Sequence, residues 1–526
     1  MIGRCLAAVA LALTVGCTEI PAAPVRTAAL ALPATTPTNP ATADALEPPP
    51  PAPREFRGAW VATVANIDWP SKPGLSAKAQ RAEAVALLDR ARAIGLNALI
   101  LQVRPAGDAL YPSTLEPWTE YLSGEQGRPP AQAGEPPFDP LAFWVQEAHR
   151  RGLELHAWFN PYRARNIAAK SPLVAPHLAV RQPALAKRYG DLLWFDPGEP
   201  AAAAQTLAVV ADVVRRYDID GVHIDDYFYP YPVTVNGADL PFPDDDSYAR
   251  YRLADGPLAR DDWRRANVDA LVQALYRTVH AIKPWLRVGI SPFGIGRPDR
   301  RPPGINGFSQ LDKLYADVER WLEQGWLDYL APQLYWPIDR PGQEFAPLLD
   351  YWIAQNRLQR QVWPGLYTSQ VPASWPAREI VDQVALQRSR APAPPGTPGA
   401  PAADGAAGSS GHIHFSLSAL AQDRAGLATL LQMGPYAQPA LVPATPWLGE
   451  AVPPAPTLRR TDRGVRIEGP ASAARWAVWR RMGNSWRFAV QPAQDRDLDA
   501  QGASAVAVGT VERTGNLSEV QILRLR

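Results

Sequence analysis

Two adjacent carboxylates, Asp225 and Asp226, follow a short apolar run at 221–224 and precede Tyr227 and Tyr229. If this segment is a strand, alternate side chains lie on opposite faces, and Asp225 and Tyr227 share the polar face. One carboxyl group of such a pair can protonate a leaving oxygen while the other stabilises or attacks the anomeric carbon of a sugar. The neighbouring aromatic rings offer faces on which sugar rings stack. The pattern therefore favours a sugar-cleaving site at a strand end.

Six further runs alternate in the same way, four of them more weakly, with their polar residues on one face, and a run at 56–64 precedes them. In the second run these residues include Gln102 and Arg104, and in the last run they are His412 and His414. One apolar and one polar face suit a sheet that packs on helices and carries functional groups on its other side. The eight predicted strands are 56–64, 98–105, 154–162, 221–229, 287–294, 329–336, 362–367 and 412–417.

Segments with helical apolar spacing separate these strands. The predicted helices are 77–94, 140–151, 201–217, 261–282, 311–324, 345–355, 377–388 and 419–432. This alternation predicts an α/β fold, a parallel (β/α)8 TIM barrel with its active site at the C-terminal strand ends. Asp225 and Asp226 lie at that end of the fourth strand. An open doubly wound sheet is the alternative, but no Gly-rich phosphate-binding loop follows the first strand.

The N-terminal segment indicates export. Arg4 precedes an apolar run, and Leu-Thr-Val-Gly-Cys at 13–17 is similar to the lipobox at which bacterial lipoproteins are cleaved and lipidated. The run is too short to span a membrane as a mature helix. We therefore expect a lipoprotein signal peptide at 1–17 and membrane attachment through a lipid on Cys17, with an ordinary cleaved signal peptide as the alternative. Thr18 favours a location in the cell envelope on the periplasmic side of the outer membrane.

Composition divides the rest of the chain into further parts. Residues 18–53 are rich in Ala, Pro and Thr and predict a disordered tether, because they cannot bury enough apolar surface to fold. The barrel is expected at 54–445, with a disordered insertion at 391–411. Beyond it, at 450–526, short alternating runs bounded by turns predict a small C-terminal β-sandwich domain of the fibronectin type III kind.

Charge and aromatic content narrow the class of partner. The net charge is +1, so the sequence gives no electrostatic reason to expect nucleic acid. The chain contains 18 Trp and 17 Tyr, several of them near predicted strand ends. Most aromatic residues belong to cores, where their burial contributes much of the stability. For the cluster after the fourth strand, including Tyr227 and Tyr229, contact with a saccharide is the favoured interpretation.

Five ordered blocks resemble the glycosyl-hydrolase-like lipoproteins formerly described as domain of unknown function 187, the DigH/YddW-like family. They are Glu-Phe-Arg-Gly-Ala-Trp at 55–60, the segments 102–113 and 156–162, Asp-Gly-Val-His-Ile-Asp-Asp-Tyr at 220–227, and Ser-Pro-Phe-Gly at 291–294. The resemblance extends over about residues 54–439. It implies a glycoside-hydrolase fold and, as substrate, the polysaccharide of bacterial cell walls: peptidoglycan glycan strands without stem peptides.

This substrate class suggests a mechanism. Peptidoglycan sugars carry a 2-acetamido group that can attack its own anomeric carbon when a carboxylate orients it. We expect Asp225 to orient this group and Asp226 to donate the proton, its pKa raised by the neighbouring charge. The adjacent aspartates resemble the pair in O-linked N-acetylglucosamine hydrolases. In the alternative, Asp225 is the nucleophile and Asp108 or Asp339 is the donor. No cofactor is expected.

Polar and aromatic residues on the same predicted face complete the candidate site. They offer donors, acceptors and ring faces for sugar groups, and His223 precedes Asp225 by two residues and could tune its charge. An inward polar residue of a barrel is about as often a structural hydrogen-bonding centre as a ligand contact. The expected substrate-binding residues are Arg104, Asp108, Trp158, Asn160, His223, Tyr227, Tyr229, Gln333, Tyr335 and Trp336.

Two other classes of protein remain open. A metal-dependent hydrolase would use histidines two residues apart on a strand, which share a face and suit zinc. Its ligands would come from His156, His223, Asp225, His412 and His414, but no metal site is predicted because their order and spacing match no known barrel metal signature. A non-catalytic wall-binding lipoprotein would use the same aromatic cleft without turnover.

Overall fold

The computed structural model describes residues 47–130, 138–392 and 408–525. Cys17, most of the predicted tether at 18–53 and the centre of the predicted insertion at 391–411 lie outside the described residues. Within these ranges, no helix combines the length and apolar character needed to cross a membrane.

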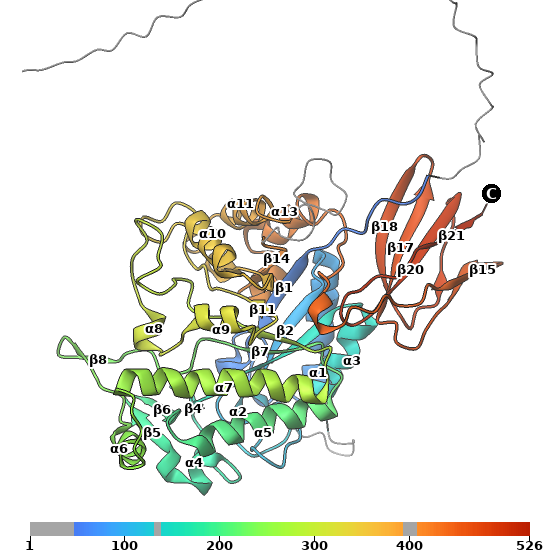
Figure 1. Ribbon diagram of the computed structural model, residues 1–526. Coiled ribbons are helices and arrows are strands. Elements are labelled where there is room, and N and C mark those ends of the chain that lie inside the picture. The colour runs from blue at the N-terminus through green and yellow to red at the C-terminus, as the bar shows by residue number, and fades with distance from the viewer. Residues whose placement is uncertain (1–46, 131–137, 393–407, 526) are drawn as a thin grey trace, which may run out of the picture. The chain divides into compact units, whose positions relative to one another are not determined.

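A closed barrel of parallel strands forms the main domain (Figure 1). Its strands are β1 (Phe56–Val61), β2 (Ala98–Arg104), β3 (Glu154–Phe159), β7 (Gly221–Ile224), β10 (Arg287–Ile290), β11 (Tyr329–Leu330), β12 (Gln361–Val362), β13 (Gly365–Leu366) and β14 (Gly411–His414). They pair in the order β12-β11-β10-β7-β3-β2-β1-β14-β13. The two ends of this order, β12 and β13, are halves of a single run interrupted at Pro364. The sheet therefore closes on itself with eight strand positions, which confirms the predicted (β/α)8 barrel.

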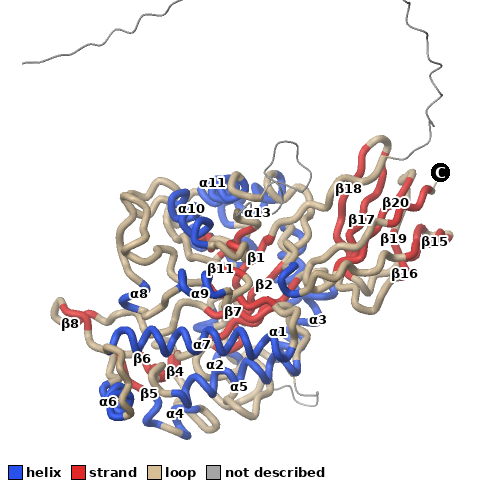
Figure 2. Tube along the Cα trace, viewed as in Figure 1, coloured by secondary structure: helices blue, strands red, loops and turns tan. Residues whose placement is uncertain are grey.

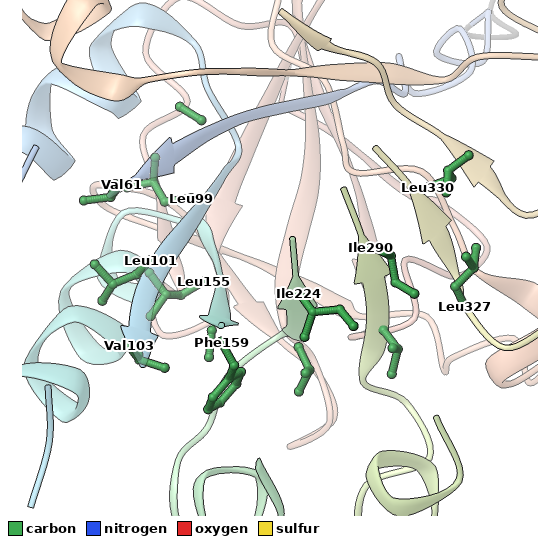
Figure 3. Close-up of a cluster of buried hydrophobic side chains, with 14 of the residues drawn as sticks. Val61, Leu99, Leu101, Val103, Leu155, Phe159, Ile224, Ile290, Leu327 and Leu330 are labelled. Carbon is green, nitrogen blue, oxygen red and sulfur yellow. The ribbon is translucent and has the colours of Figure 1, made fainter. Parts of the chain in front are cut away.

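Aliphatic side chains cover the outer face of the barrel (Figure 3). Leu99, Leu101 and Val103 of β2 alternate with inward residues, so all three point toward the surrounding helices. Ile224 of β7 and Ile290 of β10 continue the same layer. The period of two in the sequence therefore corresponds to two separate cores, one between strands and helices and one inside the barrel.

The barrel interior is filled mainly by aromatic rings. Phe56 stacks on Trp363 with ring centroids 3.8 Å apart, and Tyr329 also packs against Trp363, at 4.7 Å. Gly289 lies opposite the Tyr329 ring, and a Cβ atom at this position would come within 1.8 Å of that ring. Glycine is therefore the residue that allows the ring to cross the barrel.

The helices pack outside the strands, and the long helices α5 and α7 lie side by side (Figure 1). In α1, Ser76 caps the first turn by accepting from the backbone N–H of Ala79, and Gly95 ends the helix with φ 97°. The main helices are α1 (Ala77–Ile94), α3 (Pro140–Arg150), α5 (Pro200–Arg216), α7 (Arg260–Ile282), α9 (Val318–Gln324), α10 (Phe345–Gln355), α11 (Ala377–Arg388) and α13 (Leu427–Met433).

Two of the predicted helices are shorter than expected because left-handed residues interrupt them. The segment 311–324 divides into α8 (Gln310–Lys313) and α9, with Tyr315 between them at φ 56°. The segment 419–432 divides into α12 (Leu417–Ala421) and α13, with Asp423 at φ 48°. Apolar spacing does not report such backbone reversals.

The polar face of the eighth strand is opposite to the prediction. His412 and His414 point outward, where Gln387 of α11 and Tyr436 bind them, and Ile413 belongs to the cluster inside the barrel. Both histidines are buried, and burial lowers their pKa well below the usual value. They are neutral structural residues that fasten β14 to the helical layer.

The C-terminal domain is an antiparallel sandwich of two sheets (Figure 2). One sheet has the order β15-β16-β19 and the other the order β18-β17-β20-β21. Val465 and Ile467 of the first sheet share a core with Trp476 and Val508 of the second. The predicted β-sandwich is confirmed. Its strands are β15 (Thr457–Thr461), β16 (Gly464–Glu468), β17 (Arg475–Met482), β18 (Ser485–Pro492), β19 (Asp497–Leu498), β20 (Ala505–Val511) and β21 (Gln521–Arg524).

A small three-stranded sheet between β3 and α5 was also not predicted. It consists of β4 (Arg163–Arg165), β5 (Ala186–Tyr189) and β6 (Leu192–Phe195), with β6 in the centre. Arg163 pairs with Trp194 in this sheet, directly after the C-terminal end of β3. This sheet therefore fixes the backbone of a residue at the edge of the barrel opening. The remaining short elements are α2 (Glu120–Ser123), α4 (Leu178–Arg181), α6 (Asp245–Leu253), β8 (Thr234–Val235) and β9 (Ala238–Asp239).

Candidate active site

A cavity of about 450 Å³ lies at the C-terminal ends of the barrel strands. Among the described residues that line it, Asp225 and Asp226 are the only acids and Arg163 is the only base. Aromatic residues form much of the wall, from the first strand, the third strand and the loops after several others: Trp60, Trp158, Tyr227, Tyr231, Tyr335, Tyr367 and Phe415. The cavity is therefore an aromatic chamber with one acidic pair, large enough for one or two sugar rings.

Asp225 follows β7 directly and is 4% exposed. Its Oδ2 accepts hydrogen bonds from Trp158 Nε1 at 3.1 Å and from Asn160 Nδ2 at 2.5 Å. Burial raises the pKa of Asp225 and the charge of Asp226 adds to this rise, while Arg163 and the Asn160 hydrogen bond oppose it; together they give a pKa of about 7. Asp225 thus retains a proton to near-neutral pH while two donors fix the position of its carboxyl group.

Asp226 is equally buried, and the Tyr231 hydroxyl donates to its Oδ2. Burial raises the pKa of Asp226, while hydrogen bonds from Tyr231 and Gln333 and the charge of Arg163 lower it. We had expected the neighbouring carboxylate to be the main cause of this rise, but loss of hydration is the larger effect. Since the pKa values of both groups are raised, the pair holds a proton more readily than two free aspartates do.

A chain of amides holds the donors of Asp225 in place. Asn160 Oδ1 accepts from Gln102 Nε2 at 2.6 Å, which fixes the orientation of the Asn160 amide. Gln102 Oε1 in turn accepts from the backbone N–H groups of Thr63 and Val64 at 3.0 and 2.9 Å. The NH2 group of Asn160 can therefore point only toward Asp225. Asn160 acts through the carboxylate and does not line the cavity.

His223 lies beneath the cavity floor and makes no contact with Asp225. The indole N–H of Trp60 donates to His223 Nε2 at 3.1 Å, so the ring proton is on Nδ1, which faces the Tyr329 hydroxyl at 2.9 Å. That hydroxyl also lies 2.9 Å from Nδ1 of His156, whose Nε2 is 3.3 Å from Glu154 Oε2. Burial lowers the pKa of His223 well below its usual value. His223 is therefore neutral and supports the floor of the cavity.

Of the twelve residues predicted for catalysis or binding, six line the cavity: Trp158, Asp225, Asp226, Tyr227, Gln333 and Tyr335. Asn160 and His223 lie just behind its wall, and the other four lie elsewhere. Arg104 is fully buried and forms an ion pair with Glu116. Asp108, whose pKa burial raises to about 6, accepts from the backbone N–H of Ala106.

Tyr229 and Trp336 are the two remaining residues, and both pack against other aromatic rings. Tyr229 is buried against Phe242, with ring centroids 5.2 Å apart, and Trp336 packs edge-on against Phe293 at 5.5 Å. The alternative proton donor Asp339 is exposed and does not line the cavity.

Arg163 is the most informative residue that sequence reasoning did not assign to the site, and Tyr231 was favoured for saccharide contact only as a member of a cluster. Tyr231 belongs to the aromatic cluster after the fourth strand, and Arg163 directly follows the block at 156–162. Both lie beyond the predicted strands, where alternation no longer shows the direction of a side chain. Their proximity to these two blocks was the available signal.

The residues considered for a metal site are not brought together. Among the described residues, no group of three or more His, Cys, Asp or Glu side chains is arranged to hold a metal ion. His156 and His223 bind Tyr329 inside the barrel, whereas His412 and His414 bind Tyr436 outside it.

The closed parallel barrel, with paired carboxyl groups and aromatic walls at the C-terminal strand ends, defines a protein of the glycoside hydrolase class. Comparison with known proteins agrees. The profile of the family glycosyl hydrolase-like 10 matches residues 55–382, and the chain belongs to this family.

Two curated relatives carry the description glycosyl hydrolase. YngK of Bacillus subtilis is 40% identical over 422 residues, which cover 77% of each chain. DigH of Escherichia coli is 36% identical over 316 residues, covering 56% of this chain and 69% of DigH. Among solved structures, the PgaB (BpsB) glycoside hydrolase domain of Bordetella bronchiseptica aligns with 72% of this chain and 98% of its own, at 14% identity and a TM-score of 0.45.

Proposed function

We propose that the protein is a glycosidase that cleaves peptide-free peptidoglycan glycan strands, with Asp225 and Asp226 as its catalytic residues. The observation that carries the proposal is the acidic pair itself: two buried, adjacent carboxyl groups are the only acids among the described residues of an aromatic cavity. The descriptions of YngK and DigH support the reaction class. The resemblance to the DigH/YddW-like family supports the substrate.

The geometry favours a substrate-assisted reaction. When the acetamido N–H of the substrate donates to Asp225, it stabilises the charged form of this residue, so the shared proton moves to Asp226. The acetamido oxygen then forms a bond to C1, while the bond from C1 to the leaving oxygen breaks and Asp226 protonates that oxygen. In the second step Asp226 takes a proton from water, and the resulting hydroxide opens the oxazoline at C1.

The alternative in which Asp108 or Asp339 donates the proton has less support. Neither side chain lines the cavity. Asp225 could still act as a direct nucleophile, but Asp226 would then remain the only acid available to protonate the leaving group. Both versions therefore assign proton donation to Asp226.

The first test incubates the purified protein with amidase-treated glycan strands and identifies released sugars by mass spectrometry, with Asp225→Asn and Asp226→Asn variants beside it. Sugars released by the native protein alone would support the glycosidase. If all three proteins bind the strands without release, the protein is a wall-binding module with the same aromatic cavity.

Substrates with leaving groups of different acidity separate the roles of the two aspartates. An aryl glycoside with an acidic phenol needs little protonation, so Asp226→Asn should lose about 100- to 10,000-fold on natural strands but far less on this substrate. Asp225→Asn should lose activity on both substrates, because the acetamido group must be oriented whichever leaving group the substrate carries. Equal losses for Asp226→Asn on both substrates would contradict its role as the donor.

We also propose that the mature protein is attached to a membrane of the cell envelope through Cys17. Support comes from the lipobox-like sequence at 13–17. Labelling with an alkyne fatty acid in a bacterial host tests this, and a Cys17→Ser variant should lose the label. A labelled variant, or an unlabelled native protein, would refute lipidation at Cys17.

A further inference from the structure

Arg163 differs from the other buried cations of the barrel because no carboxylate of the described residues forms an ion pair with it. Its side chain is 5% exposed, yet no carboxylate of the described residues lies within ion-pairing distance. By contrast, Arg104 pairs with Glu116, and Arg287 pairs with Glu154 at 2.9 Å. A desolvated cation without a partner is costly, so a structure that retains one is prepared to bind an anion.

The local contacts of Arg163 leave part of its guanidinium available. The group lies over the Tyr227 ring, 4.1 Å from its centroid, and Nη1 donates to the Pro105 carbonyl at 3.5 Å. Apart from an interaction with the Tyr227 side chain, the other guanidinium nitrogens have no further hydrogen-bond partner among the described residues, and they are not among the buried unpaired atoms. Since Arg163 lines the cavity, these N–H groups are accessible from it. The ring holds the guanidinium plane, and its edge remains free to bind a planar anion through two parallel hydrogen bonds.

The charge balance of the cavity admits one anion near Arg163. The described lining residues carry the acidic pair and this one cation. Because burial keeps a proton on the pair to near-neutral pH, the pair and Arg163 together are close to neutral. An arriving carboxylate therefore meets a guanidinium that no carboxylate contacts directly, and only one negative charge.

We propose that Arg163 is a specificity residue that binds a carboxylate carried by the sugar in the cavity. The inference rests on the proposed function and extends it. In peptidoglycan, muramic acid carries a lactyl ether whose carboxyl group is free after the stem peptide is removed and is a neutral amide while the peptide is present. A guanidinium at this position binds the carboxylate through charge-assisted hydrogen bonds and cannot bind the amide in the same way. Arg163 thereby selects glycan strands from which an amide-cleaving reaction has already removed the peptides.

The test compares two forms of one substrate. Amidase-treated strands are divided, and in one half the lactyl carboxylates are converted to primary amides with a carbodiimide and ammonia. The native protein should cleave the carboxylate form about 10- to 100-fold faster in kcat/KM, the range expected for one charge-assisted contact. The Arg163→Gln variant should cleave the two forms at nearly equal rates.

The ratio of the cleavage rates of the carboxylate and amide forms separates carboxylate recognition from the other effects of replacing Arg163. Removing Arg163 also changes the charge near Asp225 and Asp226, but that change affects both substrate forms alike. Arg163→Lys keeps the charge without the planar fork and should show an intermediate ratio. The matched control is Arg165→Gln, two residues further along β4, whose guanidinium binds the Ala169 carbonyl and does not line the cavity. It should keep the native ratio.

The outcomes distinguish this inference from the proposed function. If the native protein cleaves both forms equally, or if Arg163→Gln retains the native preference, the inference is wrong and the glycosidase assignment stands. If the native protein cleaves neither form, the assignment fails. Binding of the two forms to the native protein and to Arg163→Gln, measured by calorimetry, then decides the inference alone: a carboxylate preference that depends on Arg163 supports it, and equal binding refutes it.

Discussion

At the scale of single residues, burial and hydrogen bonding act on Asp225 in opposite directions. Loss of hydration favours the protonated acid, whereas the N–H groups of Trp158 and Asn160 favour the carboxylate. The result is a group that changes its charge near neutral pH without moving. In a glycosidase this balance is useful, because one more N–H donor from the substrate is enough to shift the proton within the pair.

Replacing Asp225 with a residue that does not titrate should stabilise the protein, relative to the native protein, more at high pH than at low pH. Because the pKa of folded Asp225 is about 7 and that of an unfolded aspartate is near 3.8, the folded state binds more protons between these values, and stability falls as pH rises through this window. Asp225→Asn does not titrate. Its free energy of unfolding, relative to the native protein, should therefore increase by about 1–4 kcal/mol from pH 4 to pH 8.

Urea unfolding at the two pH values checks this expectation. Asp339→Asn, which removes an exposed carboxylate outside the cavity, is the control for a general charge effect. A difference between Asp225→Asn and the native protein that is the same at both pH values would show that the Asp225 carboxyl group is not strained by burial.

At the scale of elements, alternation of apolar and polar residues with a period of two is enough to predict a strand, its neighbours and the direction of its side chains. The outward layer of Leu99, Leu101 and Val103 and the inward residues Gln102 and Trp158 follow from alternation alone. The eighth strand fails this rule because Tyr436 and Gln387, distant in sequence, bind His412 and His414 from outside. A polar residue reveals its need for a partner, but the side on which that partner lies depends on the tertiary fold.

The residues of the candidate site could be predicted where they follow a regular strand and not elsewhere. Asp225, Asp226 and Tyr227 follow a strong strand, so their position at the barrel opening could be predicted. Arg163 lies in the short strand β4, whose pairing with β6 fixes its direction, and Tyr231 lies in a loop. Arg104 was expected to point inward, but a register shift pairs it with Phe159 of the outer layer. Its partner Glu116 could not be predicted because it lies in a loop.

The barrel interior makes a prediction about Gly289. A methyl group there would overlap the Tyr329 ring, which also bonds His156 and His223, so the ring has no room to retreat. Gly289→Ala should lower the free energy of unfolding by about 1–3 kcal/mol, as overpacked cores do. Gly449→Ala is the control, because a Cβ there would lie at an ordinary contact distance of 3.6 Å from Thr514.

A double-mutant cycle measured by urea unfolding identifies the cause. In a Tyr329→Ala background the steric conflict is absent, so the additional effect of Gly289→Ala should nearly vanish. If Gly289→Ala costs as much in that background as in the native protein, the loss arises from the backbone and not from the ring.

At the scale of the whole molecule, the C-terminal sandwich contributes cations to acids at the N-terminal end of the barrel. Arg475 at the start of β17 lies 3.3 Å from Glu154 Oε1 and donates to the Gly152 carbonyl at 2.9 Å. Glu154 is buried, also pairs with Arg287, and begins the hydrogen-bonded series that reaches His223 beneath the cavity. Arg513 pairs with Asp218 in the same region. These contacts favour a stabilising role for the sandwich, a question that sequence could not decide.

Arg475→Met should therefore destabilise the barrel as well as the sandwich. Loss of one partner from a buried ion pair typically costs about 3–5 kcal/mol, although Arg287 remains beside Glu154 and places the expected loss at the lower end. Arg459→Met is the matched control, because its pair with Glu468 is exposed and should contribute less than about 1 kcal/mol. Thermal unfolding followed by tryptophan fluorescence measures both variants. If Arg475→Met unfolds like the control, the sandwich does not stabilise the barrel through this contact, and a role in spacing or wall binding becomes the better explanation of the domain.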